Sequence, residues 1–297
     1  MNKRLVVGTS TGAIDFAPNR YKNLGIRIIP LFYTYKGVEY QENKVDAKAY
    51  YKELEGISST DDMPRTSMAK VTDIKDCFDK AISDGYDEVI VITVSSIVSG
   101  TYNVICNVAK EYEDKLKITV IDSKIACFVE GYLCVLAQKL VDEGVPTEEI
   151  IKEIEWVKKT QQFFGISSKL DFLIYGGRLK GAKAFMGKLL SICPMIGFDR
   201  EGVLGPIKTV RTPKKALHET CVRLLEIIGD RKPEDYILYH IHTGEHPVDL
   251  LKEIEKEYGI VCNHEDVIMT PVPASGSGPW LAGYGLSFIR REDEQLD

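Results

Sequence analysis

The 297-residue sequence has no apolar run of the roughly 18 to 20 residues that a transmembrane helix needs. Its start offers only three apolar residues, at 5–7, before a polar segment, which is too short for the core of a signal peptide. Excess positive charge is also missing, because 38 Lys and Arg stand against 44 Asp and Glu, a formal net charge of −6. We therefore expect a soluble, cytoplasmic protein without an electrostatic footprint for nucleic acid or anionic lipid surfaces.

The sequence also lacks the cysteine spacings that are typical of disulfide frameworks and zinc sites. The seven cysteines are odd in number and never spaced as C-x-x-C, which fits a reducing compartment better than a disulfide framework or a structural zinc site. The sequence contains neither G-x-x-x-x-G-K-[ST] nor G-x-G-x-x-G, and it has no G-x-S-x-G motif. These absences argue against a nucleotide cradle and a serine hydrolase of the common type, and we expect no cofactor.

What is present is the composition of a globular protein, with 44% hydrophobic and 28% charged residues. In the first half, short β-branched runs alternate with segments of helical periodicity, which is typical of βαβ units. We expect strands at 5–7, 26–32, 88–94 and 118–121 and helices at 71–83, 125–141 and 146–159. The near-continuous apolar strands predict a parallel α/β sheet covered on both faces. Ligand groups should then collect at the carboxyl ends of the strands.

The second half predicts another α/β domain, and we place the boundary near residue 165, giving domains 1–165 and 166–297. We expect strands at 189–198, 203–210 and 236–242, helices at 213–228 and 248–258, and a glycine-rich loop at 274–285. The hairpin signal at 199–202 predicts a mixed sheet. Because no low-complexity linker separates the halves, we expect them to pack closely, with a ligand site in the cleft between them.

Three hydroxyl-rich loops are the main candidate site. The longest, residues 95–102, follows a strand and enters a helical segment, where free backbone N–H groups and the helix dipole favour an anion. A serine that only caps the helix would explain the same pattern. The other loops are Thr9-Ser10-Thr11-Gly12 and Thr66-Ser67. All three can converge on one spot if their strands form one sheet.

Two further motifs have competing interpretations. His240 and His242 alternate along a strand, with His246 shortly after, but no third ligand lies at tight spacing, so we favour ordinary strand-end histidines and expect no metal site. Arg178 follows two glycines and either faces an anion or ends a helix in solvent. A serine nucleophile without a nearby base is a poor catalyst. The hydroxyl loops therefore favour binding over turnover.

Taken in order, these segments resemble the DegV family of bacterial fatty-acid-binding proteins over nearly the whole chain. The SSxxSGTY element at 95–102 is the most specific match. The others are the hydroxyl loop at 9–11, LGIRIIPLFYTYKGVEY at 24–40, RTS at 65–67, VIDS at 120–123, YGGRL at 175–179 and KTVRTPKKAL at 208–217.

The resemblance implies a two-domain α/β fold with a long-chain fatty acid in an apolar tunnel between the domains. By motif position, Thr66 and Ser96 would bind the carboxylate, with Ser95 and Gly100 close by, and Ser10 and Thr11 of the first loop belong to the same set. It also implies a protein without catalytic residues. Some members present the acid to a separate kinase subunit, which makes an acyl phosphate for phospholipid synthesis.

By the same analogy, Arg178 and Arg211 lie at the pocket mouth or on the partner surface. The chain departs from the family pattern at two places. The first loop, usually D-S-T-A-D, has no acid here, and the usual H-x-G-P-G is replaced by Gly276-Ser277-Gly278-Pro279-Trp280. Trp280 would then narrow the entrance or simply pack on its loop. The competing function is an enzyme that acts on a small anionic metabolite at the same loops, and the shape of the pocket discriminates between the two.

Overall fold

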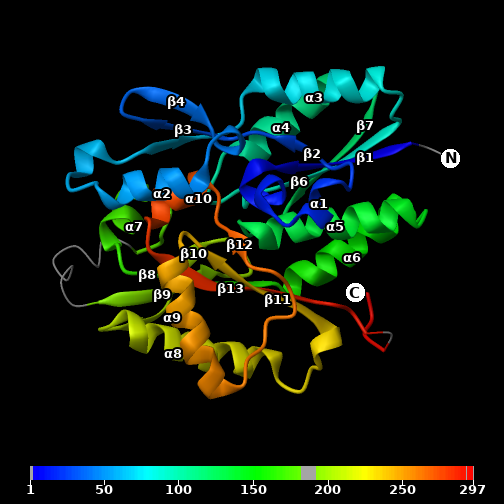
Figure 1. Ribbon diagram of the computed structural model, residues 1–297. Coiled ribbons are helices and arrows are strands. Elements are labelled where there is room, and N and C mark those ends of the chain that lie inside the picture. Colours follow the sequence, from blue (N-terminus) through cyan, green and yellow to red (C-terminus); the bar gives the residue numbers. More distant parts are fainter. Residues whose placement is uncertain (1–2, 182–191, 292, 297) are drawn as a thin grey trace.

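The computed structural model describes residues 3–181, 192–291 and 293–296 and shows two stacked α/β lobes (Figure 1). The N-terminal lobe holds a four-stranded sheet of order β2-β1-β6-β7. Every pair in it is parallel, as predicted. Its strands are β1 (Arg4–Thr9), β2 (Arg27–Ile29), β6 (Glu88–Thr93) and β7 (Lys117–Asp122).

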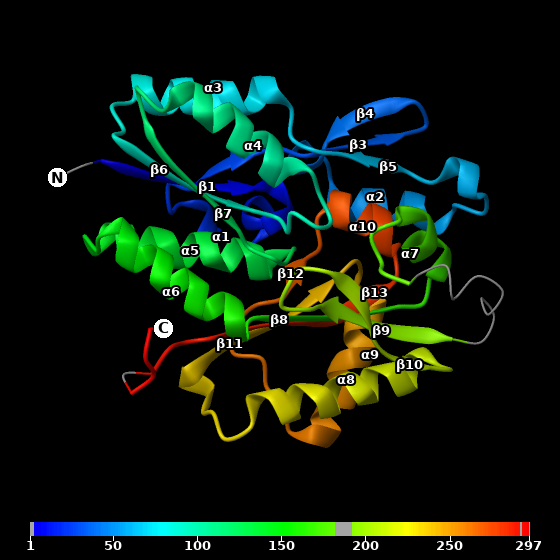
Figure 2. The same ribbon diagram turned by 180° about the vertical axis from the view of Figure 1, so that it is seen from behind.

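Helices cover both faces of this sheet (Figures 1 and 2). On the outer side lie α3 (Val71–Ser83), with the predicted bounds, and α4 (Thr101–Ala109). On the inner side, α5 (Phe128–Asp142) contacts β1 and also β13 (Leu281–Phe288) of the other lobe, and α6 (Thr147–Thr160) packs beside it. The short α1 (Asn19–Lys22) completes this lobe. The lobes share one core, in which the rings of Phe128 and Tyr239 lie 5.3 Å apart.

The single strand predicted at 26–32 is two strands. Pro30 separates β2 from β3 (Phe32–Tyr35), and a proline cannot donate to a ladder. β3 leaves the parallel sheet and forms an antiparallel sheet of order β4-β3-β5 with β4 (Val38–Gln41) and β5 (Arg65–Ser67). Thr66 pairs with Tyr33 in this sheet, and α2 (Ala47–Glu55) lies between β4 and β5 in the chain. The break at Pro30 therefore builds the support for one of the predicted hydroxyl loops.

The C-terminal lobe has a six-stranded mixed sheet of order β10-β9-β8-β13-β11-β12, as the hairpin signal predicted. Its strands are β8 (Gln162–Ser167), β9 (Cys193–Phe198), β10 (Leu204–Val210), β11 (Tyr236–His242), β12 (Val267–Ile268) and β13 (Leu281–Phe288). Its helices are α7 (Leu170–Gly176), α8 (Pro213–Ile228), α9 (Glu245–Glu255) and α10 (Pro271–Ser277). The predicted boundary at 165 falls inside β8, and the part of the predicted strand at 189–191 lies outside the described residues.

The loop predicted at 274–285 was wrong, because this segment contains most of α10 and the start of β13, an inner strand of the sheet. Its glycines provide space. A Cβ at Gly283 would lie 1.7 Å from the carbonyl oxygen of Phe164, and one at Gly285 would lie 2.4 Å from the Tyr239 ring. Glycine in a strand thus marks close approach here, although the same composition is typical of loops.

Within the described residues, we find no helix that combines the length and the apolarity needed to cross a bilayer.

Candidate functional site

A cavity of about 830 Å³ lies between the lobes, and segments from both contribute its wall. The N-terminal lobe supplies β5 and the loop after β6, while the C-terminal lobe supplies α7, α10 and the β9–β10 hairpin. Much of the wall is apolar, and its larger members are Leu31, Val94, Phe163, Leu173, Leu179, Ile196, Phe198, Leu204, Met269 and Leu281. Such a wall suits an apolar ligand.

The three predicted hydroxyl loops meet at this cavity. Thr11 after β1, Thr66 on β5 and Ser96 after β6 all line it. Thr66 is half-buried, and its hydroxyl has no protein partner among the residues that the structure describes. Thr11 is buried, and its hydroxyl is 2.9 Å from a carboxylate oxygen of Glu130. The carboxyl ends of the neighbouring parallel strands β1 and β6 therefore bring Thr11 and Ser96 together, whereas Thr66 reaches the cavity from the antiparallel β4-β3-β5 sheet.

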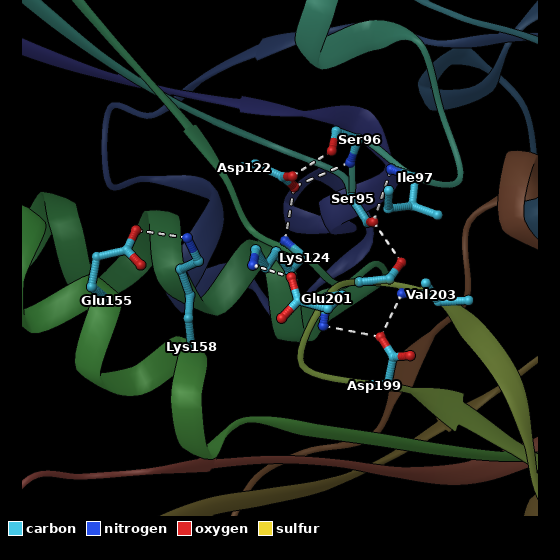
Figure 3. Close-up of polar contacts among 11 residues, drawn as sticks. Ser95, Ser96, Ile97, Asp122, Lys124, Glu155, Lys158, Asp199, Glu201 and Val203 are labelled. Atoms are coloured by element: carbon cyan, nitrogen blue, oxygen red, sulfur yellow. Dashed lines mark hydrogen bonds and ion pairs between the residues drawn. The ribbon is translucent and has the colours of Figure 1, made fainter.

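Ser96 is held by Asp122, the last residue of β7 (Figure 3). The Ser96 hydroxyl donates to Asp122 Oδ2 at 2.5 Å, and its backbone N–H donates to Oδ1 at 3.1 Å. The backbone N–H of Lys124 also donates to Oδ1, at 2.9 Å. Sequence reasoning included Asp122 only as part of the VIDS segment. Its position opposite a loop serine, one strand away, becomes visible once β6 and β7 are paired.

Ser95 and Ser10 do not line the cavity. The Ser95 hydroxyl is buried and donates to the carbonyl oxygen of Gly202 at 2.7 Å, which ties the N-terminal lobe to the β9–β10 turn (Figure 3). Ser10 donates to Glu42 and accepts from the N–H of Leu31 at 2.8 Å. Both hydroxyls are engaged in bonds that position the loops around the cavity.

Two buried glutamates support the first loop, and sequence reasoning missed both. Glu130 of α5 accepts from the hydroxyls of Thr9 and Thr11, and burial raises its pKa well above the usual range. Glu42 is 0% exposed and accepts from Ser10 and, at 2.9 Å, from the N–H of Val272 in α10. Burial raises the pKa of the Glu42 carboxyl to about 7. The first loop thus meets carboxyl groups that lie far away in the sequence.

Gly100 lines the cavity and precedes α4, whose amino terminus carries free N–H groups and a positive partial charge. Gly100 is the N-cap residue of α4, and no side chain caps this helix. The Ser99 hydroxyl accepts from the N–H of Thr101 at 3.3 Å and so stabilises the turn before the helix. Ser96 lines the cavity from the same loop.

The two predicted arginines differ in position. Arg178 is exposed, lines the cavity and donates to the carbonyl of Gly176 at 2.6 Å. The chain turns before it at Gly177, which has a φ of +67°. Arg211 is exposed after β10 and does not line the cavity. Trp280 does not line it either, and packs against the core beneath α8 and α9.

An apolar cavity between two α/β lobes, with hydroxyls gathered on part of its wall, defines a binding site for an amphipathic small molecule. The comparisons with known proteins give the family. A family model described as "Uncharacterised protein, DegV family" matches residues 7–288, and the chain belongs to this family.

Three comparisons illustrate the similarity. Protein DegV of Bacillus subtilis is 30% identical over 235 residues, which cover 78% of this chain and 82% of that protein. A crystal structure of DegV from Bacillus subtilis, described as a fatty acid binding protein, has a TM-score of 0.82 at 27% identity and covers 97% of this chain and 100% of that one. A DegV family protein from Thermus thermophilus, described with fatty acid binding, has a TM-score of 0.84 at 25% identity, with coverage of 97% and 100%.

Proposed function

We propose that this protein binds a long-chain fatty acid in the cavity between its lobes. The observation that carries the proposal is the composition of one cavity, in which hydroxyls of Thr66 and Ser96 share the wall with a set of large apolar side chains. A polar metabolite would leave those apolar side chains facing water, whereas an acyl chain would cover them. The relatives described as fatty acid binding proteins support the same ligand class.

The acyl chain supplies most of the binding free energy in this proposal. Each methylene transferred from water contributes roughly 0.8 kcal/mol, so a chain of about 14 methylenes contributes on the order of 11 kcal/mol before the costs of association. A cavity of about 830 Å³ is large for a small-molecule site, for which about 300 to 1,000 Å³ is usual. The volume therefore allows a long-chain ligand, and the apolar wall is the feature that favours an acyl chain.

The carboxylate accepts from Thr66, Ser96 and the backbone near Gly100. Thr66 is ready to donate, because its hydroxyl has no protein partner in the described part of the chain. Ser96 turns its hydroxyl from Asp122 to the ligand. Asp122 can release it, because the N–H groups of Ser96 and Lys124 still donate to this carboxylate. A carboxylate removed from water needs several such bonds.

In this account the protein is a carrier without catalytic residues, and it presents the acid to a fatty-acid kinase subunit for phospholipid synthesis. Two apolar side chains of the cavity wall, Ile97 and Tyr175, are each 58% exposed, and the exposed Arg178 lies on the same wall. An apolar and cationic rim at the ligand is the kind of surface that a partner recognises.

The test is a titration with a fluorescent long-chain fatty acid, comparing the wild type with Thr66→Ala/Ser96→Ala. Each missing donor leaves part of the buried carboxylate without a hydrogen bond, which costs about 1 to 3 kcal/mol of binding free energy. We therefore expect the affinity of the double variant for the fatty acid to fall at least tenfold. Ser83→Ala/Thr209→Ala removes two exposed hydroxyls outside the cavity and should bind as the wild type does. Equal affinity for both double variants, with unchanged circular dichroism, would reject this carboxylate site.

A further inference from the structure

A second cluster of chemically versatile side chains lies in the C-terminal lobe. His240, Glu255 and Cys262 each offer one ligand atom, and these atoms all lie within 4.8 Å of one another. His240 Nε2 is 2.8 Å from Glu255 Oε2 and 3.4 Å from Cys262 Sγ. None of the three lines the fatty-acid cavity. The cluster is therefore separate from the site already described.

Three different elements bring these side chains together. His240 is on β11, Glu255 ends α9, and Cys262 follows in the segment that leads to β12. His240 is 3% exposed and Glu255 is 8% exposed, while Cys262 is half-buried at the edge of the cluster. Any ion held here would join the sheet, the helix and the segment between them.

The imidazole is oriented by its other nitrogen. His240 Nδ1 is 2.7 Å from Asp266 Oδ1, and the Lys252 ammonium donates to the second oxygen of Asp266 at 2.5 Å. This bond fixes the ring and leaves Nε2 directed at Glu255 and Cys262. Histidines that bind zinc in proteins commonly have a carboxylate on the second ring nitrogen. Glu255 is also held, because Tyr284 donates to its Oε2 at 2.8 Å.

We propose that His240 Nε2, Cys262 Sγ and a carboxylate oxygen of Glu255 bind a zinc ion. A nitrogen, a thiolate and a carboxylate are all zinc ligands, and thiolate and imidazole together select against magnesium and calcium. Zinc bonds of about 2.0 to 2.3 Å in a tetrahedron place ligand atoms about 3.3 to 3.6 Å apart. The nitrogen–sulfur separation of 3.4 Å already fits. The distance between His240 Nε2 and the Glu255 oxygen increases by about half an ångström when zinc binds, and a water molecule is the fourth ligand.

The exchange of protons for zinc keeps the cluster neutral. In the metal-free protein, His240 Nε2 lies 2.8 Å from Glu255 and Nδ1 lies 2.7 Å from Asp266, so a protonated imidazole is paired with Glu255 while Lys252 is paired with Asp266. Zinc displaces one proton from His240 Nε2 and one from the Cys262 thiol, and both go to solvent. Two positive charges leave and two arrive, so no net charge is buried.

This site differs from the one considered from the sequence. The spacing of His240 and His242 suggested a shared ion, but His242 Nδ1 lies 2.8 Å from the carbonyl of Gly244 instead. The two other ligands, Glu255 and Cys262, come from positions 15 and 22 residues further along the chain. Glu255 returns to β11 because α9 packs against that strand, and the turn after α9 then brings Cys262 there.

The test is a titration of the reduced, chelator-treated full chain with Co²⁺, a spectroscopic substitute for Zn²⁺. We expect one equivalent to bind with a thiolate-to-cobalt charge-transfer band in the near ultraviolet, and one equivalent of Zn²⁺ to remove the band. Cys262→Ser should abolish the band, whereas Cys106→Ser, at another half-buried cysteine, should retain it. A wild type without the band, or a band that survives in Cys262→Ser, would overturn the proposal.

A second variant covers the case in which Cys262→Ser does not fold. Glu255→Gln keeps the thiol, the imidazole and the shape of the side chain. We expect it to bind Zn²⁺ at least tenfold more weakly than the wild type in competition with a chromophoric chelator. Equal affinity would remove Glu255 from the site and with it the proposed ligand set. Fatty-acid binding is measured in the same samples and should not change, so this test is independent of the proposed function.

Discussion

Glu42 is a buried side chain at the interface of the two lobes, and it forms hydrogen bonds with both. Its carboxyl accepts from Ser10 in the first loop of one lobe and from the N–H of Val272 in α10 of the other. The first loop and α10 both carry residues of the cavity wall, Thr11 and Val272 itself. The protonation of this carboxyl therefore affects the packing of the lobes around the cavity.

This carboxyl predicts a pH dependence of stability. Burial raises the pKa of Glu42 to about 7, above the usual 4.5, so the folded state holds the proton more tightly than the unfolded state. The stabilisation is complete below about pH 4.5 and is lost as pH rises through about 7, a change on the order of 3 kcal/mol. Glu42→Gln should reduce the fall in unfolding free energy between pH 5 and pH 8, measured with urea.

Glu39→Gln is the matched control, because Glu39 is an exposed carboxylate of β4 paired with Lys70. We expect it to keep the pH dependence of the wild type. If Glu42→Gln and the wild type lose the same free energy over this range, the burial of Glu42 does not control the titration.

At the scale of elements, β13 determines how the C-terminal sheet packs. Its glycines allow β8 and the Tyr239 ring to approach closely. Gly283→Ala would place a methyl group against the carbonyl of Phe164, and overpacking of this kind costs about 1 to 3 kcal/mol and occasionally more. We therefore expect a large decrease in the urea midpoint of unfolding.

Gly205→Ala is the control within the same sheet. Gly205 lies on the edge strand β10, and a Cβ there would have no atom within 4 Å. Its expected effect is within about 0.5 kcal/mol. Similar midpoints for the two variants would mean that β13 shifts freely, contrary to the close packing described here.

The elements also show what the sequence could predict. The apolar face of α3, with Ile74, Phe78 and Ala81 buried, has the helical period, and its bounds were predicted from that period. The strand β13 was missed, because its glycines are determined by neighbours more than 40 residues away in the chain. The break between β2 and β3 at Pro30 was missed because the apolar residues continue across it. The chain passes there from the parallel sheet to the antiparallel one, and this change leaves no mark in the apolar pattern.

In the whole molecule, the cavity is formed by side chains from both lobes. Thr66 and Ser96 could be predicted from their motifs, but Leu173, Ile196 and Met269 reach the same cavity from three separate elements or loops of the C-terminal lobe. Periodicity identifies such residues as buried and does not show which surface they face. The same reason explains why Glu42 and Glu130 were not singled out, since their partners lie far away in the sequence.

Native mass spectrometry of the purified protein shows whether the cavity between the lobes holds a long-chain fatty acid. We predict one bound molecule per chain, which denaturation and extraction identify as a fatty acid of about 14 to 18 carbons. Protein that carries no lipid and takes up none when fatty acid is offered would contradict the account, and a compact anionic ligand in the extract would favour the enzyme alternative.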